Sequence, residues 1–396
     1  MTEIKLATRI ERMKPSATLA MSAKAAQLKA QGRDIINLSV GEPDFDTPEH
    51  VKAAAVAALQ AGFTKYTPVD GIPELKQAII TKLAKDNGLH YEPKEIIVSA
   101  GAKQAIYNLL QVLINAGDEV IIPAPYWVSY PEMVELADGK PITISTTMQQ
   151  QLKMNAAQLS QAITPKTKLL ILNSPSNPTG LIYSAEELTT LAQVLLQHPH
   201  VFIMTDDIYE HIRWNNKPFN NIVDVCPELK DRTIVINGVS KVYSMTGWRI
   251  GYAAGPQKLI KAMTDLQSQC TSNANSIAQK AAAAALKGDQ SCVQVMVDAF
   301  AKRHQMVFER LQAIEGVSVL PAEGAFYSFP NFSPIIKELP NVQNDIEFAE
   351  YLLDKAGIAL VPGTPFGAPN HLRLSFALSD QLLAEALNRL EQAIRI

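Results

Sequence analysis

The chain has 396 residues, which is more than one ordinary hydrophobic core serves, so we expect two domains. Its formal net charge of −3 provides no basic field, which argues against nucleic acid or an acidic membrane as the main partner. Three cysteines without a C-x-x-C spacing indicate neither a disulfide framework nor a metal site such as zinc. The N-terminus carries charges and lacks the apolar core of a signal peptide, and no stretch is long enough to span a membrane, so we expect a cytoplasmic protein.

Two helix starts are signalled in the sequence. Thr47 is expected to cap the helix that opens the large domain, with Pro48 at the first helical position. Ser184 and Glu187 form a capping box ahead of an apolar-periodic run, which predicts a second helix start.

From about residue 95, short apolar runs alternate with longer amphipathic segments. Seven runs read as buried strands, at 95–99, 118–122, 141–145, 168–172, 201–205, 233–237 and 249–253. Strands joined largely by helical crossovers build a mostly parallel sheet that is covered on both faces. The sequence therefore predicts the α/β class.

After residue 255 the pattern changes to long helices and then to short strands. Helical stretches are expected at 259–286 and 293–314, and strand-like pieces at 317–320, 325–329, 358–361 and 372–376. We expect this part to form a smaller α+β domain. The predicted division is a large domain at 47–290 and a small domain built from 1–46 and 291–396.

One lysine and one arginine stand near strand ends in the stretch 240–252. Lys241 closely follows the strand at 233–237, where open α/β sheets place their chemistry. A lysine that is partly desolvated there can attack an aldehyde, and Arg249 provides a planar cation suited to phosphate. The alternative reading is a pair of solvated surface charges.

Further polar or small residues follow other predicted strands. The turn at 99–104 enters a helix and could hold a phosphate on its free N–H groups, although a plain strand-to-helix turn reads the same way. The loop at 173–180 contains two prolines and would fix the Asn177 amide. Asp206 and Tyr209 could address a ring nitrogen and a ring oxygen. The aromatic residues at 125–129 are either core or a stacking platform.

Taken together, these stretches resemble the class I aminotransferases, which are fold-type I pyridoxal-phosphate enzymes. Within that class they are most similar to the bacterial aspartate aminotransferase subgroup related to prephenate aminotransferases. The motifs that carry the resemblance lie at 13–18, 41–45, 65–68, 71–75, 125–130, 177–180, 206–209, 240–249 and 371–375. They are spread over nearly the whole chain.

The resemblance implies roles for the residues around the cofactor ring. Lys241 would bind pyridoxal 5'-phosphate covalently and later shuttle a proton at the substrate Cα. Asp206 would pair with the protonated ring nitrogen, so that the ring accepts electron density. Tyr209 and Asn177 match the groups that bond the phenolic oxygen of the ring, and Trp127 matches the stacking aromatic.

The resemblance also implies a phosphate cradle shared between two subunits. Its members are Gly101, Ala102, Lys103 and Arg249, with Tyr66 contributed by the partner of a homodimer. Some aspartate aminotransferases carry a serine three residues before the reactive lysine as a further phosphate ligand. This chain has Gly238 there, as in the bacterial subgroup.

For the substrate, Arg373 matches the arginine that takes the α-carboxylate in a fork-to-fork pair. Gly41 matches a main-chain contact, and Trp127 and Asn177 also face the substrate in the family. Lys103 is the candidate for the distal carboxylate of an acidic substrate, against a plain helix-start lysine. Lys14 matches the position associated with prephenate, against a solvated surface lysine.

The resemblance implies transamination between amino acids and 2-oxo acids, with aspartate or glutamate as amino donor. A lyase or another aminotransferase on the same scaffold is the nearest alternative, because such enzymes use the same lysine and arginine. A regulator that binds the cofactor without catalysis is the other alternative. It is disfavoured because no DNA-binding module fits before residue 30 and the chain is acidic.

Overall fold

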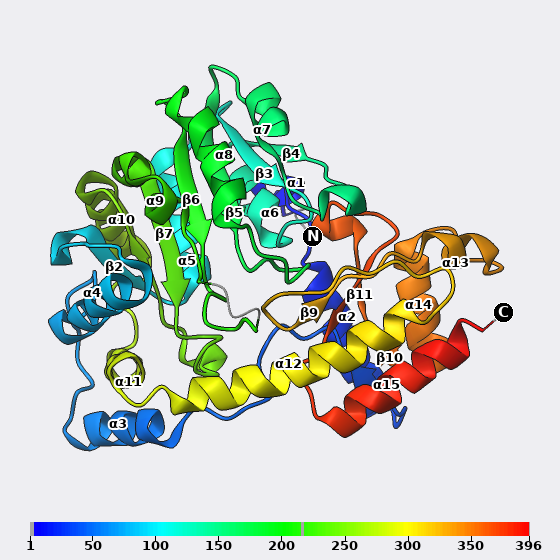
Figure 1. Ribbon diagram of the computed structural model, residues 1–396. Helices are drawn as coiled ribbons and strands as arrows, with labels where there is room; N and C mark the ends of the chain where they lie inside the picture. The colour runs from blue at the N-terminus through cyan, green and yellow to red at the C-terminus, as the bar shows by residue number, and fades with distance from the viewer. Residues whose placement is uncertain (1–3, 215–217, 396) are drawn as a thin grey trace.

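The computed structural model describes residues 4–214 and 218–395, and its centre is a seven-stranded sheet (Figure 1). The strands lie in the order β2-β8-β7-β6-β5-β3-β4, and β8 is antiparallel to both of its neighbours while the other pairs are parallel. Their bounds are β2 (Ile96–Ser99), β3 (Glu119–Pro123), β4 (Lys140–Ile144), β5 (Thr167–Asn173), β6 (Phe202–Asp206), β7 (Thr233–Gly238) and β8 (Gly251–Ala254). All seven predicted strands are confirmed, and so is the α/β class.

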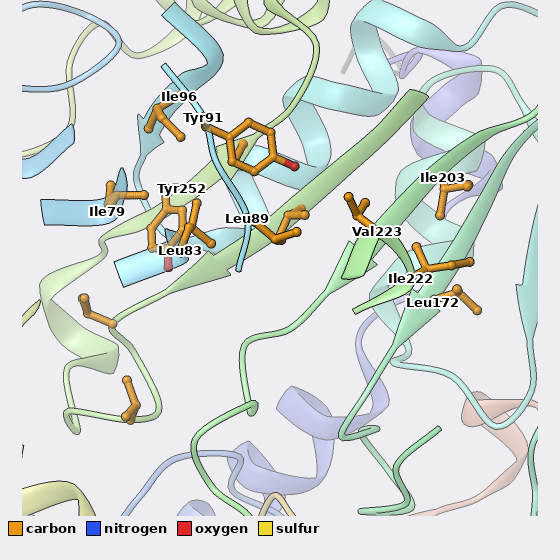
Figure 2. Close-up of a cluster of buried hydrophobic side chains, with 14 of the residues drawn as sticks. Ile79, Leu83, Leu89, Tyr91, Ile96, Leu172, Ile203, Ile222, Val223 and Tyr252 are labelled. Carbon is orange, nitrogen blue, oxygen red and sulfur yellow. The ribbon is translucent and has the colours of Figure 1, made fainter. Parts of the chain in front are cut away.

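Helices cover both faces of this sheet, because successive strand residues point to opposite sides. Ile96 and Val98 of β2 belong to one apolar cluster, part of which Figure 2 shows, whereas Ile97 belongs to another. The first cluster is covered by α3 (Glu49–Gln60), α4 (Pro73–Asn87), α7 (Ala156–Ala162), α8 (Ala185–Leu196), α9 (Ile222–Val225) and α11 (Ser276–Lys287). The second is covered by α5 (Ala102–Leu113), α6 (Ser129–Leu136) and α10 (Gln257–Cys270).

A third apolar cluster lies outside the large sheet and joins the two ends of the chain. Strand β1 (Ile36–Asn37) pairs with β10 (Ile358–Ala359), and β11 (Val361–Pro362), β12 (Leu372–Ser375) and β9 (Tyr327–Ser328) form a small antiparallel sheet. The helices of this region are α2 (Ala17–Ala30), α12 (Ser291–Gln312), α13 (Ser333–Glu338), α14 (Asp345–Ala356) and α15 (Asp380–Ala393), with α1 (Thr8–Arg12) lying near α6. Helix α12 extends from the region of α11 to that of α15 (Figure 1).

The first two clusters belong to the large sheet and the third joins both ends of the chain, an arrangement consistent with a large domain and a composite small domain. The division at 46/47 and 290/291 stays a prediction, and its residues 1–3 and 396 lie outside the described residues. Among the helices of the described ranges, none has both the length and the apolar character needed to cross a membrane.

The capping box of Ser184 and Glu187 is confirmed at the start of α8. The cap predicted at Thr47 is wrong. Pro48 occupies the N-cap position of α3, which has no side-chain capping bond, and the Thr47 hydroxyl donates instead to the Ser244 carbonyl at 2.8 Å. The stretch at 259–286 is two helices rather than one, since Ser272 has φ 61° and the Asn275 side chain caps α11 by accepting from the Ala278 amide.

The strand-like stretch at 317–320 forms no strand of the small sheet. Ser318 makes only an isolated bridge to Asn331. The other three stretches of that region do contain strands, although these are shorter than the apolar runs that predicted them.

A buried ion pair ties α4 to the turn that follows β6. The Lys82 ammonium contacts the Glu210 carboxylate, and Asn87 and Asn237 donate to the same carboxylate at 2.6 Å each. Burial acts to raise the pKa of Glu210, but the charges of Lys82 and His211, together with the hydrogen bonds from Lys82 and Asn87, more than offset this, and the pKa lies below its ordinary value. Glu210 is therefore ionised within the core, and its charge depends on this single lysine and the adjacent His211.

We expect Lys82→Met to lower the free energy of unfolding by about 3–5 kcal/mol, since it leaves a buried carboxylate without its main counter-charge. Urea unfolding followed by circular dichroism measures this. Adding Glu210→Gln should recover at least half of the loss. The matched surface control is Lys261→Met, which breaks the exposed Lys261–Asp265 pair and should cost less than about 0.5 kcal/mol. Equal losses for the two lysines would contradict a special role for the buried pair.

Candidate active site

A cavity of about 280 Å³ lies at the carboxyl ends of the strands. In open α/β sheets this edge is where ligands bind. Most of the predicted site residues line it: Gly41, Ala102, Lys103, Trp127, Asn177, Asp206, Tyr209, Lys241, Arg249 and Arg373. Lys241 and Arg249 reach this edge from two different strands. Lys241 follows the end of β7, whereas Arg249 precedes β8, which is antiparallel to β7 and so begins at the same edge.

Lys241 carries an amine that is poorly solvated. Its Nζ donates to the Gly41 carbonyl oxygen at 2.6 Å. Burial lowers the pKa of Lys241 to about 8, and the charges of Arg373 and Arg249 add to this while Glu42 opposes it. A substantial fraction of the amine is therefore neutral, and so nucleophilic, at slightly alkaline pH.

Asp206 lies at the end of β6 and is buried. Burial raises the pKa of Asp206 to about 6, although the Tyr130 hydroxyl, which donates to Oδ2 at 2.7 Å, acts in the opposite direction. The Asn173 side chain donates to the Asp206 carbonyl oxygen at 2.8 Å and so ties β5 to β6 at this point. The carboxylate is thus held in a fixed place and is mostly ionised above neutral pH.

The neighbouring Asp207 faces away from the cavity. Its carboxylate accepts from the Asn221 amide at 2.5 Å and from the Thr205 hydroxyl at 3.3 Å. Because Asp206 lines the cavity and Asp207 does not, the structure distinguishes two carboxylates that the sequence places side by side.

Arg373 on β12 is the largest of the fully buried side chains, with 1% of its surface exposed. Its Nη1 donates to Asn177 Oδ1 at 3.0 Å and its Nη2 to the Ser39 carbonyl at 2.6 Å. The guanidinium lies over the rings of Tyr327 and Phe366. Within the described residues it forms no salt bridge, and its Nε has no hydrogen-bond partner. The group is therefore a positive charge prepared to receive an anion.

Lys103 and Trp127 lie together on one wall. The Lys103 ammonium is 4.7 Å from the centre of the Trp127 ring, and Trp127 meets Tyr130 edge-on. Partial burial and the nearby Arg249 lower the pKa of Lys103. The Arg249 guanidinium donates to the Thr246 carbonyl at 2.8 Å and remains exposed.

Three predicted residues do not line the cavity. Gly101 precedes its wall as the N-cap of α5, and Lys14 is exposed, with its backbone N–H donating to Glu132 at 2.7 Å. Tyr66 is 92% exposed. The position of Gly238 is also explained: a Cβ there would lie 2.9 Å from the Ile250 carbonyl oxygen, so no larger residue fits between β7 and β8.

Sequence reasoning missed several polar groups of the cavity. Tyr130, which donates to Asp206, was part of a quoted motif but had no role. The Tyr327 hydroxyl lies 2.9 Å from that of Tyr209, yet Tyr327 sits in an apolar run that reads only as core. Ser240 also lines the cavity. The usable signal was chemical, because a buried tyrosine needs a partner for its hydroxyl group.

The chain resembles a known sequence family and named proteins over nearly its whole length. Residues 33–390 match the family model described as aminotransferase class I and II. The chain is 53% identical over 392 residues to the aspartate/prephenate aminotransferase of Nitrosomonas europaea, which covers 98% of this chain and 99% of that protein. It is 52% identical over 389 residues to the aspartate aminotransferase of Geobacillus stearothermophilus, covering 98% of each.

Two solved structures are similar over nearly their full length. The aspartate aminotransferase from Rhizobium meliloti superposes with a TM-score of 0.96 at 45% identity, covering 99% of each chain. The aspartate aminotransferase from Thermus thermophilus with maleate gives a TM-score of 0.93 at 43% identity, covering 99% of this chain and 100% of that one.

We expect Arg373→Met to leave the free energy of unfolding unchanged or to raise it by about 1 kcal/mol, because it removes a buried charge that has no carboxylate partner. Thermal and urea unfolding of the protein without ligand measure this. The matched control is Arg303→Met. Arg303 is equally inside the protein but donates to Asp44 at 2.7 Å and Asp380 at 3.0 Å, so its loss should cost about 1–2 kcal/mol after screening. A larger loss at Arg373 than at Arg303 would contradict this account.

Proposed function

From the premise that the chain belongs to the class I and II aminotransferase family, we propose that this aminotransferase acts on aspartate or glutamate. It moves their amino group to a 2-oxo acid such as 2-oxoglutarate or oxaloacetate, in two half-reactions. The observation that carries the proposal is the convergence of Lys241, Asp206 and Arg373 on one cavity. A nucleophilic amine, a buried carboxylate and a cation without a counter-ion are what amine exchange on an α-amino acid requires.

Pyridoxal 5'-phosphate is the proposed cofactor, and the residues present fit it. When bound, it supplies an aldehyde for amine exchange and a ring that accepts electron density. Gly101 has φ +89°, and a Cβ there would collide with the Arg249 guanidinium, so the glycine leaves room beside a cation. The first N–H groups of α5, from Ala102 and Lys103, lack acceptors within the helix. Together these groups suit a phosphate.

The ring would be held by groups on opposite walls. Asp206 would bind the protonated ring nitrogen, and the ionised state of this carboxylate is favoured by Tyr130. Tyr209 and the Asn177 amide would hold the phenolic oxygen, and Trp127 would cover one face of the ring. Lys241 would act at its Nζ, first as the nucleophile and then as the group that takes and returns the Cα proton.

The substrate α-carboxylate would be received by Arg373, whose unpartnered Nε lies inside the protein. Asn177 fixes the guanidinium from one side and the Ser39 carbonyl from the other. The Gly41 carbonyl, which accepts from Lys241, contributes main-chain contact on the same side of the cavity. The amine of the substrate is thereby oriented toward Lys241.

We further propose a homodimer in which Tyr66 reaches the phosphate of the partner's site. The Tyr66 side chain is 92% exposed in the single chain, so its ring is available to a second subunit. The expected partners are otherwise small molecules. The cytoplasmic location stays a prediction.

The assignment of Lys241 is tested by chemical trapping. Borohydride reduction of the holoenzyme followed by peptide mapping should place the cofactor on Lys241, and Lys241→Ala should fold but lose at least about 10⁴-fold in kcat, because the nucleophile and proton carrier are removed together. A label on Lys103 instead would overturn the assignment.

The lowered pKa of Lys241 predicts a pH dependence. The ordinary lysine is protonated below about pH 10, whereas here the neutral amine accumulates as the pH rises through about 8. The rate at which the cofactor-free protein takes up pyridoxal phosphate should therefore rise about tenfold per pH unit below pH 8 and level off above it. Stopped-flow absorbance measures this rate. A rise that continues beyond pH 10 would show that the amine is not desolvated.

Substrate choice is tested at Lys103 and Lys14. Arg373 binds the carboxylate that all amino acids share, so a preference for acidic substrates needs a second cation. We propose that Lys103 binds the distal carboxylate and that Lys14 serves prephenate, an additional acceptor. Lys103→Ala should lower kcat/KM for aspartate by roughly ten- to a hundredfold, which corresponds to about 1.5–3 kcal/mol, and affect alanine much less.

Lys14→Ala should mainly impair turnover with prephenate and leave that with oxaloacetate nearly unchanged. Half-reactions with each amino acid and each 2-oxo acid, followed by cofactor absorbance, measure both effects. Equal losses for aspartate and alanine in Lys103→Ala would assign this lysine to the phosphate and leave the distal carboxylate to another group.

A further inference from the structure

Gln267 on α10 is a fully buried amide with all of its contacts inside the protein. Its Oε1 accepts from the Ser99 hydroxyl at 2.6 Å and from Asn108 Nδ2 at 2.9 Å. Its Nε2 donates to the Val69 carbonyl at 2.8 Å and to the Val98 carbonyl at 2.9 Å. Two donors and two acceptor positions are thus used, which is the full capacity of the side chain and fixes its orientation.

One pair of these contacts holds the end of β2. Val98 and Ser99 are the last residues of that strand, and the Ser99 carbonyl accepts from the Gly101 amide at 2.8 Å. Gly101 is the N-cap of α5, whose first turn forms a wall of the cavity. Gln267 therefore fixes the proposed phosphate-binding turn indirectly, through Val98 and Ser99. In Figure 1, α10, β2 and α5 lie side by side, as their contacts require.

The contact with the Val69 carbonyl holds the segment that carries Tyr66. Val69 lies three residues after Tyr66, and the Val98 amide donates to the carbonyl of the next residue, Asp70, at 3.0 Å. The loop is thus bound to β2 on one side and to Gln267 on the other. Since the Tyr66 side chain is exposed, its direction depends on how this loop backbone is fixed.

Two neighbouring side chains each contact only one of the two segments that Gln267 holds. Gln279 on α11, also fully buried, accepts from the Ile72 amide at 2.8 Å and donates to the Thr67 hydroxyl at 3.1 Å and to the Ala274 carbonyl at 2.8 Å. It therefore holds the Tyr66 segment to the residues before α11 and makes no hydrogen bond to the end of β2. The Ser99 hydroxyl contacts Gln267 at the end of β2 and makes no contact with the loop. They provide matched comparisons for the two functions of Gln267.

We propose that Gln267 is a positioning residue for two active sites at once: it fixes the phosphate-binding turn of its own subunit and the Tyr66 segment that this subunit lends to its partner. The inference rests on the proposed function, because it requires the cofactor phosphate and the dimer. It goes beyond that function by assigning a residue outside the cavity to the phosphate of both sites.

Hybrid dimers with a single working site separate the two effects. Two differently tagged subunits are co-expressed, and one carries Lys241→Ala, so that only the lysine of the other subunit can bind pyridoxal phosphate covalently. Gln267→Leu is then placed either in the subunit that keeps Lys241 or in the Lys241→Ala subunit. The first hybrid has an altered turn at the working site, and the second has an altered Tyr66 segment there.

The measured quantities are the dissociation constants of pyridoxal phosphate and of pyridoxal, which lacks the phosphate, read from the absorbance of the lysine-bound form. We expect both hybrids to bind pyridoxal phosphate about tenfold more weakly than the hybrid without Gln267→Leu, with pyridoxal affinity unchanged. Ser99→Ala should act only in the subunit that keeps Lys241, and Gln279→Leu only in the other. Should Gln267→Leu fail to fold, Gln267→Glu keeps its size but loses both donors, and the same pattern is expected.

An effect of Gln267→Leu in only one of the two hybrids would overturn the proposal, and so would equal losses for pyridoxal and pyridoxal phosphate, which indicate general loosening. These outcomes differ from a failure of the proposed function. In that case the hybrid without Gln267→Leu would itself bind no cofactor on Lys241, or the tagged subunits would not associate.

Discussion

The turn that follows β6 depends on a charge buried beneath it. Glu210 is surrounded by Lys82, Asn87 and Asn237, so this residue anchors the turn to α4 and to the end of β7. Asp206, the last residue of β6, and Tyr209, in the turn itself, line the cavity instead. The ion pair of Glu210 is therefore structural, while the residues one and four positions earlier face the cavity. The positions of Asp206 and Tyr209 therefore depend on the ion pair of Lys82 and Glu210.

Burial shifts the pKa values of Asp206 and Lys241 in opposite directions. It raises the pKa of the Asp206 carboxyl to about 6 and lowers that of the Lys241 amine to about 8, because in each case it disfavours the charged form. Both values move toward neutrality, so both groups can change state at little cost near physiological pH. Arg373 differs because it is buried as well but remains charged. Its charge is kept inside the protein without a carboxylate partner among the described residues, which costs stability.

Much of the fold and part of the site could be predicted from the sequence. Apolar runs locate all seven strands. Six of these are buried along nearly their whole length, whereas β4 at the edge of the sheet is partly exposed and keeps Ile144 in the core. The residues after the parallel strands reach one edge of the sheet. What was missed depends on contacts distant in sequence. Thr47 donates to Ser244, 197 residues away, and so does not cap α3. Nothing in the sequence next to Tyr130 and Tyr327 indicates a partner for their hydroxyl groups, and only the fold brings these to Asp206 and Tyr209.

The place of β8 in the sheet has a consequence for how the chain reaches this structure during synthesis. Strand β2 (Ile96–Ser99) pairs only with β8 (Gly251–Ala254), so its apolar edge stays open until some 150 further residues have left the ribosome. Strands β3 to β7 can pair with one another before that time. The turn after β2 and the loop from Lys241 to Arg249 are brought together only in the last step of sheet assembly. An unfinished chain thus exposes an unpaired strand edge and lacks the assembled cavity. During this interval the nascent protein depends most on protection from aggregation.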